Sequence, residues 1–229
     1  MLQAHSSDTE EDVAFRNVWA VPLPPRPSKA ADAGGFVDLF DGRTLAGWRQ
    51  LGGGAVYTVE DDAIVGRTRP REPNSFLCTD ADYGDFVLEL EFMVDDKLNS
   101  GVQIRSQGRP EGGRTRVFGY QVEIDPSPRA WSAGIYDEGR RGWLKNLAEN
   151  TPGRVAFRPR AWNRLRVEAR GPRMRTFLNG IPAADLEDDM TPAGFIGLQV
   201  HGVGNRVDPL AVRWRRIRLR PLGSENRSE

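Results

Sequence analysis

The sequence predicts an all-β protein whose strands form a two-sheet antiparallel sandwich, or jelly roll. Short runs of alternating apolar and polar residues recur along the 229-residue chain, and Gly, Pro, Asn and Asp residues separate them. Long helical periodicity is absent, and the strand signals lack the spacing of strand–helix–strand units. Many short strands without helical crossovers are typical of sandwiches and jelly rolls.

The chain divides into one domain and two tails. Residues 1–34 begin acidic and become Pro-rich, so we expect an N-terminal tail that is extended or disordered. Residues 35–221 carry the strand pattern, and residues 222–229 form a polar C-terminal tail.

The expected strands follow one another along the domain. They lie at residues 36–40, 56–59, 63–67, 75–79, 85–94, 100–106, 117–125, 132–136, 154–157, 162–169, 173–178, 194–201 and 211–220. Asp61-Asp62 and Asn179-Gly180 stand between such segments, and Asn-Gly suits the two positive φ angles of a tight hairpin turn. Residues 144–150 are expected to form one short helical turn.

The composition excludes several classes of partner. Lys and Arg total 32 and so do Asp and Glu, so no net field favours nucleic acid or an acidic membrane. No apolar run approaches the ~20 residues of a membrane span, and the N-terminus lacks the cationic and apolar regions of an export signal. Cys78 is the only cysteine and is expected to be a small core residue. We therefore expect no nucleic acid and no membrane partner.

Three of the expected strands carry unusual polar residues on one face. Successive side chains of a strand point to opposite faces, so the alternate polar residues stay together. They are Gln103 and Arg105, then Gln121, Glu123 and Asp125, then Gln199 and His201. A solvated sheet face is the ordinary alternative for any one such strand. Amides, carboxylates, an Arg and the only His of the domain together predict a concave surface that hydrogen-bonds a sugar.

Several segments resemble the 3-keto-disaccharide hydrolase family, formerly a domain of unknown function. In order, they are Gly35–Trp48, Asn74–Cys78, Asn99–Ser106, Gly119–Asp125, Gly134–Trp143 and Gly194–His201. The resemblance implies a concanavalin A-like jelly roll that acts on glycosides whose glucose unit is oxidised at C3. It also implies a divalent metal ion in some relatives, and a periplasmic or secreted location, although no signal peptide is visible. Residues 1–34 lie outside it.

A ketone at C3 changes how a glycosidic bond breaks. The C2 proton becomes acidic because the carbanion delocalises into the carbonyl as an enolate. The substituent at C1 then leaves by elimination, and addition of water completes a net hydrolysis. Such a site needs a base at C2, an electrophile at the C3 oxygen and an acid for the departing oxygen. The expected partner is therefore a small carbohydrate, whereas the sequence leaves the oligomeric state open.

The polar face supplies candidates for these roles. Glu123 and His201 are expected to act as metal ligand and base, in either order, with one divalent metal ion as the only cofactor considered. Asp125 is a further candidate base or ligand, about 6–7 Å from Glu123 at Cβ. Arg105 is expected to hold the enolate or a sugar hydroxyl, or else to pair with Glu123 or Asp125. The amides expected to bind hydroxyls, because they both donate and accept, are Gln103, Gln121 and Gln199.

The loop Tyr136–Trp143 is the second group of candidates. Glycines flank Arg140 and Arg141, so the backbone can turn sharply and direct both guanidinium groups toward substrate. Tyr136 or Asp137 is expected to protonate the leaving group. Trp143, or Trp131, is expected to stack on a sugar ring, with ordinary packing as the alternative. By contrast, packing alone is expected of Trp48, Trp162 and Trp214.

Other functions fit parts of this pattern. Glu123-Ile-Asp125 resembles the Glu-x-Asp start of jelly-roll β-glucanase sites, but the second Glu of those sites would fall at Pro128. A conventional two-carboxylate glycoside hydrolase is therefore a distant alternative. A non-catalytic carbohydrate-binding module would use the Gln, Arg and Trp residues without the Glu–His pair. A structural domain that binds a protein through this face is the third alternative.

Overall fold

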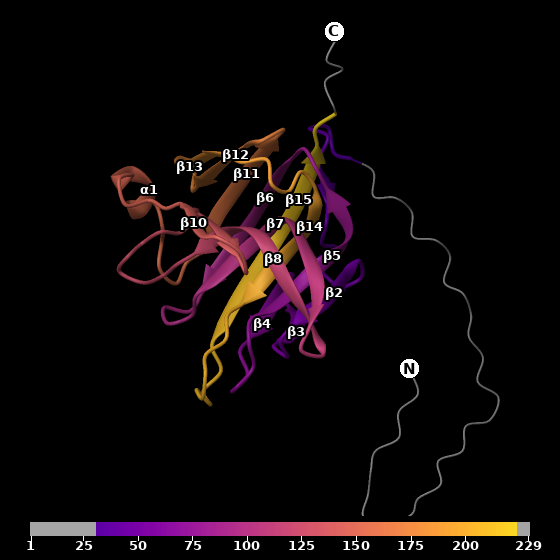
Figure 1. The fold of residues 1–229 in the computed structure, drawn as a ribbon, viewed down its shortest axis with the longest axis vertical. Coiled ribbons are helices and arrows are strands. Elements are labelled where there is room, and N and C mark those ends of the chain that lie inside the picture. The colour runs from indigo at the N-terminus through magenta and orange to yellow at the C-terminus, as the bar shows by residue number, and fades with distance from the viewer. Residues whose placement is uncertain (1–30, 224–229) are drawn as a thin grey trace, which may run out of the picture.

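The computed structural model describes residues 31–223 and confirms the two-sheet antiparallel sandwich (Figure 1). Sheet A has the order β13 (Ile181–Glu187), β12 (Arg173–Leu178), β11 (Asn163–Arg170), β6 (Phe86–Val94), β15 (Ala211–Pro221), β4 (Ala63–Arg67) and β3 (Val56–Glu60), and β1 (Val37–Asp38) pairs with β15. Sheet B has the order β10 (Gly142–Lys145), β9 (Ile135–Glu138), β8 (Arg114–Ile124), β7 (Ser100–Glu111), β14 (Gly194–Val200), β5 (Ser75–Tyr83) and β2 (Trp48–Gly52). The predicted tails fall largely outside the described residues.

Both predicted hairpin turns are present. Asp61 and Asp62 connect β3 to β4 with φ angles of 48° and 58°, and Asn179 and Gly180 connect β12 to β13 with φ angles of 52° and 86°. Two consecutive positive φ angles match the right-handed twist of the flanking strands, which explains why Asn, Asp and Gly occupy these positions.

Five local features differ from the predictions. The strands β2, β10 and β13 are absent from the predicted set, and all three lie at a sheet edge, where a strand buries too little of one face to show clear alternation. The predicted strand at 154–157 is wrong, because residues 151–155 form the short helix α1 (Thr151–Val155). Asn150 caps it by accepting from the Gly153 amide at 2.9 Å. The helical turn expected at 144–150 therefore begins later.

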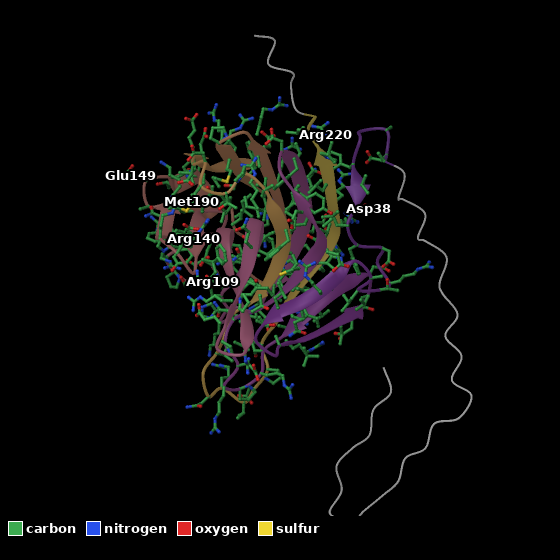
Figure 2. All side chains as sticks on the ribbon, turned by 45° about the vertical axis from the view of Figure 1, so that its right-hand side comes forward. Asp38, Arg109, Arg140, Glu149, Met190 and Arg220 are labelled. Carbon is green, nitrogen blue, oxygen red and sulfur yellow. The ribbon has the colours of Figure 1, made fainter. Side chains whose placement is uncertain are left out.

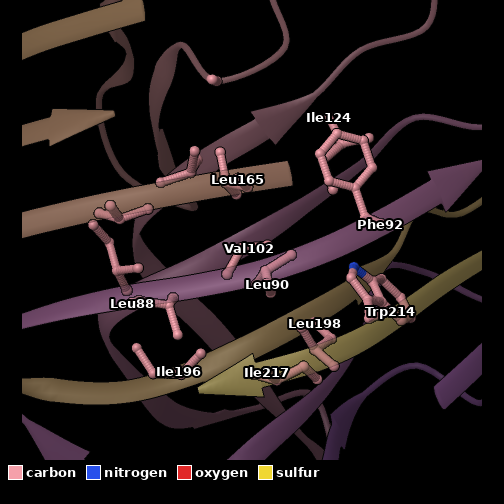
Figure 3. Close-up of a cluster of buried hydrophobic side chains, with 14 of the residues drawn as sticks. Leu88, Leu90, Phe92, Val102, Ile124, Leu165, Ile196, Leu198, Trp214 and Ile217 are labelled. Carbon is pink, nitrogen blue, oxygen red and sulfur yellow. The ribbon is translucent and has the colours of Figure 1, made fainter. Parts of the chain in front are cut away.

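The core lies between the sheets and consists of alternate apolar residues of both (Figure 3). The central strand of sheet A contributes Leu88, Leu90 and Phe92, which face Val102 and Leu198 of sheet B. Each of these side chains is at most 1% exposed. Such burial of apolar area is the main favourable term in folding.

The predicted packing residues are found in this framework. Trp48 and Trp214 belong to the core, and Trp162 lies under the guanidinium of Arg215. Cys78 is fully buried, as expected. Within residues 31–223, the only helix is far too short to cross a membrane.

Arg105 ties the two sheets together rather than facing outward. The register between β7 and β8 shifts after Ile104, and Arg105 adopts a φ of 46°. A bulge of this kind interrupts the alternation of side chains. Arg105 donates through Nε to the Gly84 carbonyl at 2.8 Å, through Nη1 to the Gly171 carbonyl at 2.7 Å and through Nη2 to Asp85 at 2.9 Å. The prediction that it shares the face of Gln103 is therefore wrong.

We expect Arg105→Ala to lower the free energy of unfolding by about 3 kcal/mol, because it removes the guanidinium donor from two carbonyls and the ion-pair partner of Asp85. The matched control is Arg109→Ala on the same strand, whose half-exposed side chain pairs with Glu111 and should change stability by less than about 0.5 kcal/mol. Urea unfolding of both variants measures the difference. Equal effects would contradict the tie between the sheets.

Candidate functional site

Four of the predicted polar residues lie together on the outer face of sheet B. Gln103 of β7 stands opposite Gln121 of β8. In the next row, Gly101 separates Glu123 of β8 from Gln199 of β14. The alternation of each strand and this register together put the four side chains over adjacent strands.

These residues are buried although they face away from the core. Gln103, Gln121, Glu123 and Gln199 are each at most 5% exposed. Beside them, the tip of the long β7–β8 hairpin, residues 107–117, which we call the roof hairpin, packs on the outer side of sheet B (Figure 1).

Contacts of the roof hairpin with β2, β5 and β14 hold it over the sheet. Val117 packs with Phe76, Cys78 and Phe195 in a small apolar cluster of its own. Arg114 forms an ion pair of 2.7 Å with Glu72, which also accepts from the Gly54 amide. The hairpin therefore covers outward-facing apolar residues of β5 and β14, next to the buried polar residues.

A continuous chain of hydrogen bonds runs through this interior to Glu123. Ser106 Oγ donates to Gln103 Oε1 at 2.7 Å, and Gln103 Nε2 donates to Gln121 Oε1 at 2.6 Å. Gln121 Nε2 in turn donates to Glu123 Oε2 at 2.8 Å. Every link points its donor toward the carboxyl group, so the amide dipoles favour the ionised form of Glu123.

Glu123 nevertheless holds its proton more strongly than a free carboxyl group. Burial raises the pKa of Glu123 to about 7, against the opposing effect of the Asn99 and Gln121 hydrogen bonds. Asn99 Nδ2 donates to Oε1 at 2.6 Å, so each carboxyl oxygen already has one donor. A group that is half protonated near neutral pH can both accept and return a proton.

Glu138 is a second carboxyl group of this face, and it is absent from the predicted residues. It lies on β9 two residues after Tyr136, which stands opposite Gln121, so alternation puts it on the same side of sheet B. Burial raises the pKa of Glu138, and the hydrogen bond from Asn74, at 3.3 Å, opposes that rise. Glu138 lines a cavity of about 340 Å³ with Asn74 and Phe76. The alternation of side chains along β9, counted from Tyr136, could have predicted that Glu138 lies on this face.

Three aromatic rings flank Glu123 on the side of β9 and β10. The ring centroid of Trp143 lies 4.9 Å from that of Trp131 and 5.4 Å from that of Tyr136, both edge to face. We call these three residues the aromatic wall. Arg129, also absent from the predicted residues, lies 4.8 Å over the Trp131 ring, and its Nη2 is 3.7 Å from Glu123. Apolar rings beside charged groups are common where proteins hold sugars or cations.

Asp125 organises the loop that carries Arg129. Its carboxylate accepts from Arg129 Nε at 2.8 Å and from the Ser127 amide at 3.1 Å. Burial raises the pKa of Asp125, but the hydrogen bonds from Ser127 and Arg129 outweigh it, and the pKa is lowered. Asp125 therefore stays ionised and is a poor proton carrier at neutral pH.

The structure places Asp137, Arg140 and Arg141 away from Glu123. Asp137 is fully buried and accepts from Arg140 Nε at 2.7 Å and from Arg141 Nε at 2.5 Å. Arg141 also pairs with Asp188 at 2.8 Å. The predicted proton donor Asp137 lies on the opposite side of the sheet from Tyr136, because adjacent residues of a strand face opposite sides. The two arginines hold the β9–β10 turn against residues 188–191 (Figure 2).

The predicted Glu123–His201 metal pair is not assembled. His201 is exposed just beyond β14, with Nδ1 2.8 Å from the Gly202 carbonyl oxygen, and its charge acts on Glu138. Both oxygens of Glu123 accept amide hydrogens. In residues 31–223 no three His, Cys, Asp or Glu side chains form a group that could hold a metal ion. These donors do not fit a preformed metal site.

Among the four buried polar residues of this face, Gln199 alone has a side chain that makes no hydrogen bond. Its side chain is fully buried, and neither its Oε1 nor its Nε2 has a partner among the described residues. A buried amide in this state carries a free donor and a free acceptor, each of which costs free energy until a ligand or water satisfies it.

Comparisons with known proteins identify relatives of this fold. A family model described as a 3-keto-alpha-glucoside-1,2-lyase-like domain matches residues 35–220. A proposed glycosyl hydrolase from Parabacteroides distasonis ATCC 8503 is 17% identical, with a TM-score of 0.58 over 83% of this chain and 95% of its own. The carbohydrate-binding module CBM66 from Bacillus subtilis is 19% identical, with a TM-score of 0.54 over 75% and 93%.

A third solved structure, a protein of unknown function with a galectin-like fold from Bacillus subtilis, is 12% identical, with a TM-score of 0.57 over 77% of this chain and 90% of its own. A search of curated proteins found no match. At these identities the solved structures establish the fold alone.

We expect Gly101→Ala to break the hydrogen-bond chain. A Cβ at residue 101 would lie 2.5 Å from Cδ of Gln121, so the Gln121 amide must move away from Glu123. Loss of that donor should raise the pKa of Glu123 by a further ~1 unit. A ¹³C NMR titration of the carboxyl groups measures it. Gly223→Ala, in open space, is the control, and an unchanged Glu123 pKa in Gly101→Ala would contradict the chain.

Stability should fall as the pH rises from about 5 to about 8. The pKa of Glu123 is about 7 in the folded protein and 4.5 as the ordinary value, so the folded state binds the proton more tightly. Its contribution is complete below the ordinary value and is lost as the pH rises through about 7, up to about 3 kcal/mol. Glu123→Gln should flatten this part of the profile, measured by urea unfolding. Glu111→Gln, at an exposed carboxylate, should not.

Proposed function

The chain belongs to the family of 3-keto-alpha-glucoside-1,2-lyase-like domains, and we propose that its covered sheet face cleaves the C1–O bond of a 3-keto-glycoside. The observation that carries the proposal is Glu123, a buried carboxyl group whose pKa is raised to about 7 and which ends a chain of oriented amides. A base of this strength suits the removal of a C2 proton next to a ketone at neutral pH.

Glu123 is the proposed base. Asn99 and Gln121 hold one oxygen each, so the carboxylate cannot rotate and keeps a lone pair free for the proton. When the C2–H bond breaks, its electron pair becomes part of the enolate of C2, C3 and the C3 oxygen. Expulsion of the C1 oxygen with its bonding pair then leaves a double bond between C1 and C2.

Arg129 and Glu138 are the proposed partners of this step. Arg129 reaches within 3.7 Å of Glu123 and carries a permanent charge, so it can stabilise the negative C3 oxygen. The raised pKa of Glu138 favours a protonated carboxyl group that can donate to the departing oxygen. Water then adds at C1 and gives a proton back to Glu138, while Glu123 returns its proton to C2, which completes a net hydrolysis.

The remaining polar residues suit recognition of the sugar. The aromatic wall offers apolar faces beside Glu123, and the free amide of Gln199 can both donate to and accept from hydroxyl groups. Tyr136 and Trp143 thus take recognition roles in this proposal. A requirement for a divalent metal ion stays a prediction.

A carbohydrate-binding module is the second candidate. CBM66 of Bacillus subtilis shares the fold, and the amides and aromatic wall need no proton transfer to bind a sugar. Such a module has no use for a carboxyl group whose pKa lies near neutrality, which favours the enzyme.

Release of the aglycone from a 3-keto-glucoside and from its unoxidised parent tests the proposal. We expect release from the keto compound alone, a rate that rises with pH through about 7 as Glu123 ionises, and a loss of at least roughly 100-fold in Glu123→Gln. Glu187→Gln, at an exposed carboxylate of β13 in sheet A, is the control for a carboxylate outside the face.

Full turnover in Glu123→Gln would contradict the assigned base. Cleavage of the unoxidised parent would instead indicate a conventional glycoside hydrolase. Binding of both sugars without turnover would indicate the module. Addition of a chelator to the same assay tests the predicted metal requirement.

A further inference from the structure

The outer face of sheet A carries an ordered lattice of charges. Its central strand, β6, presents residues 87, 89 and 91 outward, between β11 and β15. The cross-strand rows are Arg164–Glu91–Arg215, Arg166–Glu89–Arg218 and Glu168–Val87–Arg220. In the first two rows a carboxylate stands between two arginines, whereas in the third row Val87 takes that place.

The central carboxylates neutralise the arginines around them. Glu89 accepts from Arg164 at 2.9 Å, from Arg166 at 2.7 Å and from Arg218 at 2.7 Å. In the same way Glu91 accepts from Arg215 at 2.8 Å and from Arg216 at 3.0 Å. One anionic group per row thus organises two or three guanidinium groups.

The third row has no anion at its centre. Its only carboxylate, Glu168, is displaced to β11 and is engaged by Arg166 and Arg175. Across Val87, the Arg220 guanidinium contacts the Gly34 carbonyl at 3.3 Å and the Phe36 ring. Arg220 Nε is buried and has no hydrogen-bond partner among the described residues. Arg220 lies at the end of β15 (Figure 2).

A cavity of about 450 Å³ opens above Val87. Its charged lining consists of Arg166, Arg170, Arg173, Arg175, Arg220 and the single carboxylate of Glu168. Within residues 31–223, Asp185 pairs with Arg173 at 2.6 Å, whereas no carboxylate pairs with Arg220. Guanidinium groups that converge on one hollow make a site for the planar and tetrahedral oxyanions that they bind in pairs.

We propose that the Val87 cavity binds an oxyanion, a phosphate or sulfate group, at the place where the lattice lacks its third carboxylate. The volume exceeds that of a bare ion and leaves room for a sugar that carries the group as an ester. The site lies on the opposite sheet from Glu123 and does not depend on the proposed catalysis.

Titration of the full chain with inorganic sulfate, inorganic phosphate and a sulfated monosaccharide, followed through the arginine Nε–H signals by NMR, tests this site. We expect saturable shifts of Arg220 that weaken as sodium chloride is added. Arg220→Gln should weaken binding roughly tenfold, because it removes a charged donor. Arg216→Gln, on the same face but bound to Glu91, is the matched control and should leave the affinity unchanged.

Val87→Glu is the second variant. A carboxylate at this position would supply the missing anion, so it should abolish binding in a protein whose thermal unfolding remains cooperative. Absence of saturable shifts up to roughly 10 mM, or equal binding by wild type, Arg220→Gln and a folded Val87→Glu, would overturn the proposal. Tighter binding of the sulfated sugar than of inorganic sulfate would assign the site to an ester, and equal binding to the free ion.

Discussion

The burial of polar side chains on the outer face of sheet B is the constraint on which this structure depends. Polar groups removed from water must be hydrogen-bonded, and here each amide or hydroxyl donates to the next until the chain ends on Glu123. The bulge after Ile104 turns Arg105 toward the sheet junction at the base of the roof hairpin. The bulge in β7 thus lies between the Arg105 contacts that join the two sheets and the roof hairpin.

Charged groups are arranged differently on the outer faces of sheet A and sheet B. On sheet A, partly exposed arginines neutralise carboxylates such as the buried Glu89, and the ion pairs form a regular array. On sheet B, neutral amides surround one buried carboxyl group, whose proton affinity rises because water is excluded. The same fold therefore presents an ordered charged surface on one side and a tunable acid–base group on the other.

The sequence predicted the sandwich, both tight turns and the common face of Gln103, Gln121, Glu123 and Gln199, because these depend on local alternation. It could not predict the bulge at Arg105, since residues 105–109 contain no apolar side chain that would reveal the shift in alternation. The alternation along β9 could also have predicted the face on which Glu138 lies. Its hydrogen bond with Asn74 is visible only in the folded structure. The expected pairing of His201 with Glu123 failed for a similar reason, because only the tertiary fold shows that His201 acts on Glu138.

The loss of deuterium from C2 of a labelled 3-keto-glucoside tests the central claim most directly. If Glu123 removes the C2 proton before the C1–O bond breaks, the wild-type protein should slow on the labelled sugar. Sugar recovered unreacted from the wild-type protein should carry hydrogen at C2. With Glu123→Gln, we expect neither this exchange nor the isotope effect. Cleavage with no isotope effect and full retention of deuterium in recovered substrate would contradict the enolate route and the role of Glu123.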